Sequence, residues 1–127
     1  MSKYVLDASA LLALLNNETG VDVVREILPD AIISAVNFSE VIAWLTRLQI
    51  PEDEVSDILD VLGLTIIPFD TELAYKTGQM AEMTKSLGLS LGDRACLALA
   101  IKLKATAVTA DKVWGNLGNM VQIKMIR

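Results

Sequence analysis

Histidine is absent from this 127-residue sequence, and cysteine occurs only once, as Cys96. Without histidine the chain cannot use Ser-His-Asp or Cys-His catalysis, and nearly every catalytic zinc site is excluded. A single cysteine cannot form an internal disulfide, which agrees with a cytoplasmic protein. Any chemistry must therefore come from carboxylates, lysine, arginine, tyrosine, hydroxyl groups or a bound metal ion.

Long hydrophobic runs are also missing. No stretch approaches the roughly 20 apolar residues that a membrane-spanning helix needs. Residues 8–15 are the nearest to a signal-peptide core, but Asp7 precedes them, and Asn-Asn-Glu at 16–18 replaces the small residues of a cleavage site. We therefore expect a cytoplasmic protein without a membrane partner, folded as a single domain over residues 1–127.

The composition combines an apolar excess with an uneven charge. Apolar residues make up 53% of the chain, and the mean hydropathy is +0.46, which is high for a domain of this size. Such an excess predicts a dimer or partner surface, because a small domain cannot bury all its apolar side chains. The net charge is −5, but the first half is strongly acidic and the second half basic. Bound cations would offset the acidic half, so the net charge does not exclude a phosphate-rich substrate.

Short apolar runs alternate with helical patterns along the whole chain. Continuous apolar runs are typical of parallel strands covered on both faces. The predicted strands are residues 4–6, 31–33, 64–67 and 106–108, with a weaker fifth at 121–123. The predicted helices are residues 8–16, 20–28, 36–48, 52–62, 71–87 and 91–104. This alternation predicts an α/β fold, a doubly wound α/β sandwich of about five parallel strands with helices on both faces.

Four carboxylates stand at positions that such a fold brings together. Asp7 and Asp111 each end a predicted strand, whereas Glu40 and Asp93 lie in the first turns of predicted helices. Each also has a structural interpretation. Asp7 could be a helix N-cap, Asp111 a turn residue, Asp93 half of a capping box and Glu40 a partly buried, hydrogen-bonded glutamate.

The combination indicates a metal site more strongly than any one acid does. In a doubly wound sheet, all four can converge where the strand order reverses. Two carboxylates about 4 Å apart repel by about 4 kcal/mol at an effective dielectric constant near 20, so the cluster requires cations. Ligands that are all oxygen atoms select Mg²⁺ or Mn²⁺ over zinc.

Four short motifs resemble those of a known family. They are Val-Leu-Asp-Ala-Ser at 5–9, Asn-Phe-Ser-Glu at 37–40, Leu-Ser-Leu-Gly-Asp at 89–93 and Thr-Ala-Asp at 109–111. In order and spacing they are similar to the acidic motifs of PIN-domain nucleases, in particular the VapC-type toxins of toxin–antitoxin pairs. The resemblance covers the whole chain. It implies a PIN-like five-stranded parallel sheet, an endoribonuclease that uses one or two Mg²⁺ or Mn²⁺ ions, a homodimer, and an antitoxin that covers the site.

The resemblance also assigns roles to residues. The catalytic, metal-binding acids would be Asp7, Glu40, Asp93 and Asp111. The supporting hydroxyl groups would be those of Ser9 and Thr109. The segment 52–60 is strongly acidic, so not all of the surface can face RNA, and RNA contacts are expected in the basic half. Each candidate there can also be interpreted as an ordinary solvated charge. These candidates are Arg94, Lys102, Lys104 and Lys112.

Other interpretations remain open. The chain could be a catalytically inactive PIN-like binding module, or a phospho-receiver-like signalling domain, which has a similar length and an acidic pocket. Residues 88–92 match the G-x-S-x-G pattern of a nucleophile elbow, but that motif needs a preceding strand and a histidine partner.

An antitoxin helix needs an apolar groove, which we expect among the first four predicted helices. The residues expected around it are Leu11, Leu14, Leu15, Val41 and Trp44.

Overall fold

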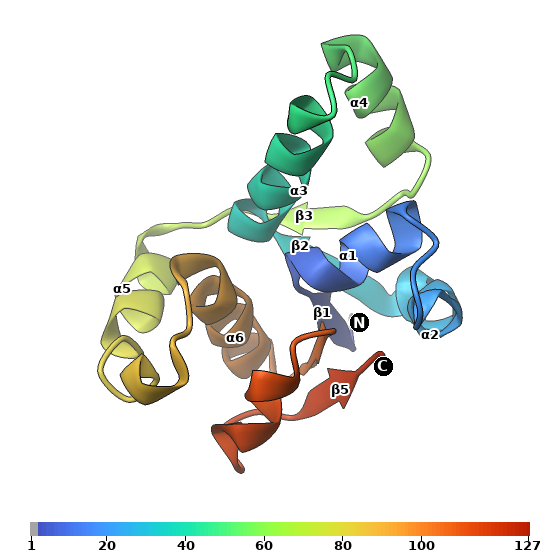
Figure 1. Ribbon diagram of the computed structural model, residues 1–127. Helices are drawn as coiled ribbons and strands as arrows, with labels where there is room; N and C mark the ends of the chain where they lie inside the picture. The colour runs from blue at the N-terminus through green and yellow to red at the C-terminus, as the bar shows by residue number, and fades with distance from the viewer. Residues whose placement is uncertain (1–2) are drawn as a thin grey trace.

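The computed structural model describes residues 3–127, and its centre is a five-stranded parallel sheet (Figure 1). The strands are β1 (Tyr4–Leu6), β2 (Ala31–Ser34), β3 (Thr65–Ile67), β4 (Thr106–Thr109) and β5 (Ile123–Met125). Their order is β3-β2-β1-β4-β5, which confirms the predicted fold class. Strands β2 and β3 lie on one side of β1, and β4 and β5, which come later in the sequence, lie on the other side. The strand order therefore reverses between β1 and β4, the position at which such sheets bind ligands.

Helices connect the strands and cover both faces of the sheet. The α-helices are α1 (Ala8–Leu15), α2 (Val21–Ile27), α3 (Ala35–Arg47), α4 (Glu52–Asp60), α5 (Thr71–Gln79) and α6 (Leu91–Leu103). Short 3-10 helices are η1 (Leu28–Asp30), η2 (Lys85–Leu87) and η3 (Lys112–Leu117). Within residues 3–127, none of these helices has the length and apolar content of a membrane span.

Side-chain alternation along the strands divides the core between the two faces. Aligned residues of β1, β2 and β4 pack beneath α5 and α6: Val5, Ile32 and Ala107. The next residue of each strand points to the opposite face, toward α1 to α4: Leu6, Ile33 and Val108. Because the central strands are buried on both faces, their sequences show continuous apolar runs instead of alternation.

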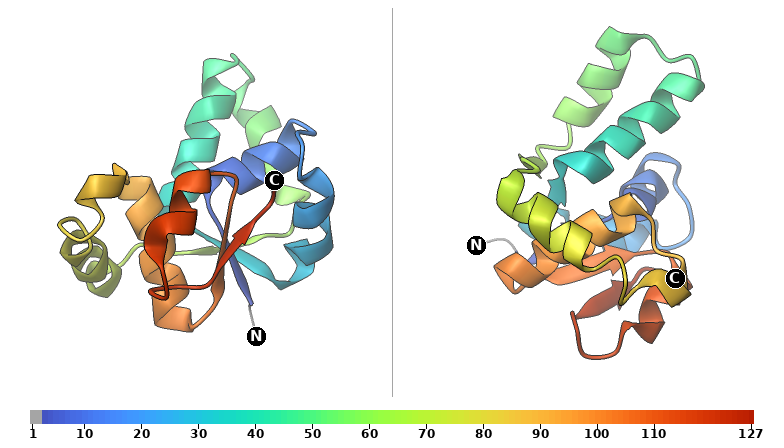
Figure 2. Two further views of the ribbon diagram at one scale, coloured as in Figure 1. Left: turned by 60° about the horizontal axis from the view of Figure 1, so that its bottom comes forward. Right: turned by 90° about the vertical axis from the view of Figure 1, so that its left-hand side faces the viewer.

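Helices α3 and α4 form a hairpin that extends away from the sheet, as both views in Figure 2 show. The hairpin is held by buried apolar residues: Val41 and Leu45 from α3, and Val55 and Leu59 from α4. Ser34 caps α3, because its Oγ accepts a hydrogen bond from the Val36 backbone N–H at 3.2 Å. The start of α3 is thus fixed directly at the end of β2, which sets the position of Glu40.

Two predicted elements are wrong in their bounds. The helix predicted over 71–87 ends at Gln79 and continues as turns and η2. Gly78 weakens its last turn, and the Thr84 hydroxyl donates to the Met80 carbonyl oxygen at 2.8 Å, a local bond that competes with helix continuation. The fifth strand begins at Ile123 instead of Val121, because Ile123 is the residue aligned with Ala107 of β4.

Candidate metal centre

Asp7 is a buried carboxylate at the end of β1, with 4% of its surface exposed. Its Oδ1 accepts hydrogen bonds from the Ala10 backbone N–H at 2.9 Å and from Ser9 Oγ at 2.7 Å, and its Oδ2 accepts one from Thr109 Oγ1 at 2.5 Å. Burial raises the pKa of Asp7 to about 6; these hydrogen bonds oppose the increase, and the charge of Asp93 adds to it. Asp7 is therefore a helix cap, as one interpretation predicted, and also a carboxylate kept away from water.

The predicted supporting hydroxyl groups, Ser9 and Thr109, both donate to Asp7. Each also accepts a backbone N–H from the segment that follows β4. Ala110 N–H donates to Ser9 Oγ at 2.9 Å, and Asp111 N–H donates to Thr109 Oγ1 at 3.0 Å. The ends of β1 and β4 are thus joined through two hydroxyl groups, which orient the Asp7 carboxylate.

Glu40 and Asp93 are brought toward each other where α3 crosses α6. Asn37 Nδ2 donates to Glu40 Oε1 at 3.0 Å and to the Gly92 carbonyl oxygen at 2.9 Å. Gly92 directly precedes Asp93 on α6. Asp93 also forms the predicted capping box, since its Oδ2 accepts from the Ser90 backbone N–H at 2.9 Å. Sequence reasoning did not assign a role to Asn37 or Gly92.

A buried thiol shows that three of the acids share one neighbourhood. Cys96 lies one helical turn after Asp93 and is fully buried. Burial raises the pKa of the Cys96 thiol well above its usual value, and the negative charges of Asp7, Asp93 and Glu40 raise it further. The Cys96 thiol also donates to the Val5 carbonyl oxygen at 3.8 Å, so α6 packs against β1 and brings Asp93 to the strand that Asp7 follows.

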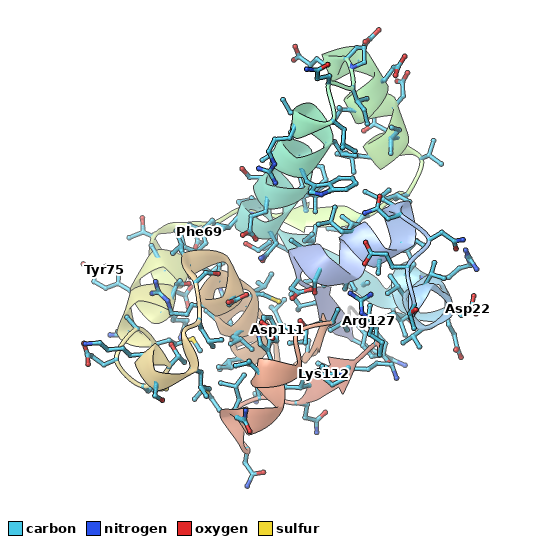
Figure 3. The ribbon with its side chains drawn as sticks, viewed as in Figure 1. Asp22, Phe69, Tyr75, Asp111, Lys112 and Arg127 are labelled. Atoms are coloured by element: carbon cyan, nitrogen blue, oxygen red, sulfur yellow. The ribbon has the colours of Figure 1, made fainter. Side chains whose placement is uncertain are left out.

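Asp111 is joined less directly to this region. It directly precedes η3 as its N-cap (Figure 3), and its Oδ1 accepts a hydrogen bond from the Val113 backbone N–H at 3.0 Å, so it also fulfils its predicted turn role. Thr109 connects it to Asp7 through the Asp111 backbone. Across residues 3–127, no three or more Cys, Asp or Glu side chains are gathered tightly enough to form a ready-made metal site.

The chemistry of the donor set nonetheless fits a hard divalent cation. The ion pairs found in residues 3–127 join Arg25 to Asp22, Lys102 to Glu72 and Arg127 to Glu18. None of the four predicted acids is neutralised in this way. Carboxylates that share a region without a basic partner are stabilised by a cation, and oxygen ligands favour Mg²⁺ or Mn²⁺.

The four basic candidates for RNA contact lie in different places. Arg94 donates to the Thr77 carbonyl oxygen at 3.0 Å and so joins α6 to α5. Lys102 forms an ion pair with Glu72. With a rise of 1.5 Å per residue, Lys102 lies about 14 Å from Asp93 along the axis of α6, and Lys104 lies about 17 Å from it. They therefore lie at the opposite end of α6 from Asp93. Lys112 is exposed beside Asp111 (Figure 3).

The predicted docking groove is wrong at two of its five residues. Leu11 and Val41 are completely buried and belong to the core. A groove of about 280 Å³ lies instead between α3 and α4. It is lined by Phe38, Ile42, Glu52, Val55, Ser56, Leu59 and Asp60.

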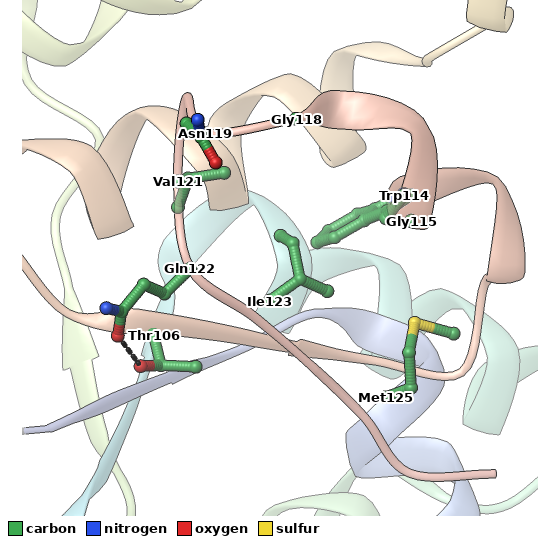
Figure 4. A pocket seen from close by; sticks show the side chains of 9 residues that line it. All are labelled: Thr106, Trp114, Gly115, Gly118, Asn119, Val121, Gln122, Ile123 and Met125. Carbon is green, nitrogen blue, oxygen red and sulfur yellow. Dashed lines mark hydrogen bonds between the residues drawn. The ribbon is translucent and has the colours of Figure 1, made fainter.

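A separate cavity of about 650 Å³ lies beside β5 and η3 (Figure 4). Its lining includes Trp114, Asn119 and Gln122, and Gln122 accepts a hydrogen bond from the Thr106 hydroxyl at 3.3 Å. None of the four acids lines it. The acids therefore lie apart from this cavity.

Comparison with solved structures supports the fold. The chain matches DNA-bound VapBC from Salmonella typhimurium with a TM-score of 0.79 and 18% identity, covering 100% of both chains. It matches FitAcB from Neisseria gonorrhoeae with a TM-score of 0.70 and 21% identity, covering 97% of both chains. VapBC-5 from Mycobacterium tuberculosis, a member of the VapBC family of toxin–antitoxin systems, gives a TM-score of 0.63 and 17% identity, covering 100% of this chain and 99% of that one.

Sequence comparison assigns the family. No curated protein sequence matches significantly. A family model described as the PIN domain matches residues 4–119, which contain all four acids, both supporting hydroxyl groups and every strand except β5. The chain therefore belongs to the PIN domain family.

Proposed function

We propose that this chain is a Mg²⁺- or Mn²⁺-dependent endoribonuclease and the toxin of a toxin–antitoxin pair. The observation that carries the proposal is the shared neighbourhood of three carboxylates. Asn37 joins Glu40 to Gly92, the residue before Asp93, and the Cys96 thiol of the same helix donates to the carbonyl oxygen of Val5, two residues before Asp7. None of the three acids has a basic partner within residues 3–127. Membership of the PIN domain family, whose members are generally nucleases, supports the same activity.

The residues would have different roles in phosphodiester hydrolysis. Asp7, Glu40 and Asp93 would hold one or two divalent ions, with Asp111 as a fourth ligand after a change of its side-chain conformation. When bound, the ions would lower the pKa of water and stabilise the charge that develops on the phosphate. Ser9 and Thr109 would keep the Asp7 carboxylate in one orientation through their hydrogen bonds. Lys112, which is exposed beside Asp111, would attract the RNA backbone.

The phospho-receiver alternative is disfavoured by the sheet. Receiver domains have the strand order 2-1-3-4-5, in which the first strand lies between the second and third. Here β1 lies between β2 and β4. An inactive binding module would not need Asp7, Glu40 and Asp93 to lie together without a basic partner among the described residues.

We further propose a cognate antitoxin as partner. The similar structures include VapBC complexes and a toxin–antitoxin complex from Klebsiella pneumoniae. The groove between α3 and α4 would receive an amphipathic helix of that antitoxin on the apolar side chains of Phe38 and Ile42. Glu52 and Asp60 lie at the same groove, so the docked helix should be basic.

The test of the enzymatic proposal is the chemistry of the product ends. Metal-independent ribonucleases generally activate the 2′-hydroxyl of the substrate with a histidine or a similar base, and this leaves a 2′,3′-cyclic phosphate. This chain has no histidine. We therefore expect a labelled RNA oligonucleotide to be cut to 5′-phosphate and 3′-hydroxyl ends, with cleavage stopped by EDTA and restored by Mg²⁺ or Mn²⁺.

The control separates this activity from a contaminating ribonuclease. Asp93→Asn protein, purified in the same way, should leave the oligonucleotide intact. Cyclic phosphate ends, or cleavage by wild-type protein that continues in excess EDTA, would contradict the proposed mechanism.

A further inference from the structure

The contact between α3 and α6 contains two residues to which the catalytic proposal gives no role. Asn37 lies one helical turn before Glu40, and Gly92 directly precedes Asp93. The Asn37 amide bridges the two helices, because its Nδ2 donates to both Glu40 Oε1 and the Gly92 carbonyl oxygen. The same two residues that join the helices therefore also touch the Glu40 carboxylate.

The Asn37 side chain is buried at a cost in stability that its contact between the helices does not explain. Its side chain is buried with 1% exposure, and its Oδ1 has no hydrogen-bond partner within residues 3–127. The amide cannot be reversed, because that would turn Oδ1 toward two oxygen acceptors. A buried oxygen without a partner destabilises the fold, so an asparagine here indicates a function for its Nδ2.

Gly92 leaves room that the Glu40 carboxylate occupies. Gly92 is not in the left-handed region, so the backbone of α6 does not require glycine at this position. A Cβ atom on residue 92 would lie 2.5 Å from Oε1 and 2.5 Å from Oε2 of Glu40. Both oxygens belong to the end of a flexible side chain, so an alanine would displace the carboxylate and leave the helix backbone in place.

We propose that Asn37 and Gly92 are positioning residues that hold the Glu40 carboxylate against the start of α6, beside Asp93. Asn37 fixes one carboxylate oxygen by a hydrogen bond, and Gly92 provides a flat surface of backbone atoms for both. Glu40 is exposed to solvent, and a solvent-exposed glutamate would otherwise sample many rotamers. This inference rests on the proposed function, because it gives the positioned carboxylate a metal to bind.

The variant Gly92→Ala tests the inference against a matched control, Gly78→Ala. Both glycines lie in helices, and a Cβ atom on Gly78 would meet nothing within 4 Å. Because alanine favours helix more than glycine does, both variants should melt at the wild-type temperature or about 3 °C higher. Mn²⁺ affinity of the full chain, measured by electron paramagnetic resonance without RNA, should fall about tenfold to a hundredfold in Gly92→Ala and stay unchanged in Gly78→Ala. Wild-type Mn²⁺ affinity in Gly92→Ala, or an equal loss in Gly78→Ala, would overturn the inference.

Asn37→Ala provides a second, independent measurement. Its Mn²⁺ affinity should also fall. Its cleavage of RNA should recover when the Mn²⁺ concentration is raised, because a higher concentration overcomes weak metal binding but does not refold a misfolded protein. Wild-type affinity in Asn37→Ala would overturn the role of Asn37.

Glu40→Gln is the reference that separates the two proposals. If Glu40→Gln loses Mn²⁺ affinity while Gly92→Ala and Asn37→Ala do not, the inference fails and the proposed metal site stands. If Glu40→Gln binds Mn²⁺ like the wild type, the proposed site itself is wrong.

Discussion

Asp7 combines a structural and a chemical role, and the two have opposite effects on stability. As the N-cap of α1, Asp7 stabilises the helix by accepting the Ala10 N–H. As a buried charge, it destabilises the folded state. Its pKa rises from 3.8 to about 6 on folding, so the folded protein binds the proton more tightly than the unfolded chain does. The contribution of this group to stability therefore falls by about 3 kcal/mol as the pH rises from below 4 to above 6.

We predict that Asp7→Asn removes this pH dependence. The amide oxygen can still cap α1, but it carries no charge to bury. In EDTA, the free energy of unfolding of the variant should equal or exceed that of the wild type at pH 7, and should lose its advantage near pH 4. Denaturant titrations at the two pH values measure this difference.

Asp70→Asn is the matched control, because Asp70 also caps a helix by accepting the Leu73 N–H at 2.9 Å but lies outside the acidic region. It should show no gain at pH 7. A large loss of stability in Asp7→Asn at pH 7 would mean that capping outweighs the burial of charge.

The sequence located some residues of the candidate site and not others, for a physical reason. Asp7 and Asp111 follow strands, and strand ends of a parallel sheet meet at one edge, so pattern alone located them. The position of Asn37 beside Glu40 and Gly92 could not be predicted, because its partner, the Gly92 carbonyl, belongs to another helix 55 positions away. Only the crossing of α3 and α6 reveals that contact. The one available signal was a polar residue on the apolar face of α3, one turn before Glu40.

At the scale of elements, local patterns described the helices of the α3–α4 hairpin well but not the packing between them. The bounds of α3 and α4 were nearly correct, since apolar periodicity and Pro51 define them. The groove between them was misplaced, because periodicity shows which face of a helix is apolar but not which helix covers it. Val41 proved to be core, whereas Phe38 and Ile42 line the groove.

This hairpin leads to a prediction about the antitoxin. Reversing the charge at the groove with Glu52→Lys should weaken binding of the cognate antitoxin about tenfold at low ionic strength, and the loss should shrink as salt is added. Glu26→Lys makes the same change of charge on α2, at an exposed residue outside the groove, and should have little effect. Calorimetric titration of each variant with purified antitoxin tests this. Equal weakening in both variants would indicate nonspecific attraction and would contradict docking at the groove.

At the scale of the whole molecule, part of the apolar excess in the composition is exposed at the surface. Several large apolar side chains are exposed, including Val61 at 85%, Tyr75 at 69% and Met83 at 60%. Tyr75 extends from α5 into solvent in Figure 3. Side chains of this kind favour association with another protein surface.

We therefore expect the chain to form a homodimer when the antitoxin is absent. Light scattering coupled to size exclusion, over a range of concentrations, should give twice the mass of the chain, which is 13.8 kDa. The dimer should persist at high salt, because apolar association persists when charge is screened. A single species of monomer mass at all concentrations would contradict the expectation.

The position of β1 between β2 and β4 has a consequence for incomplete chains. A polypeptide cut short before β4 would contain Asp7, Glu40 and Asp93, but it would lack the Thr109 hydroxyl that holds Asp7. One edge of β1 would also be left unpaired, and such edges associate with other strands and aggregate. Under the proposed function, a ribosome that stalls early, or a protease that clips the chain, would thus release an inert fragment. Under the same proposal, only chains synthesised at least through β4 would be active.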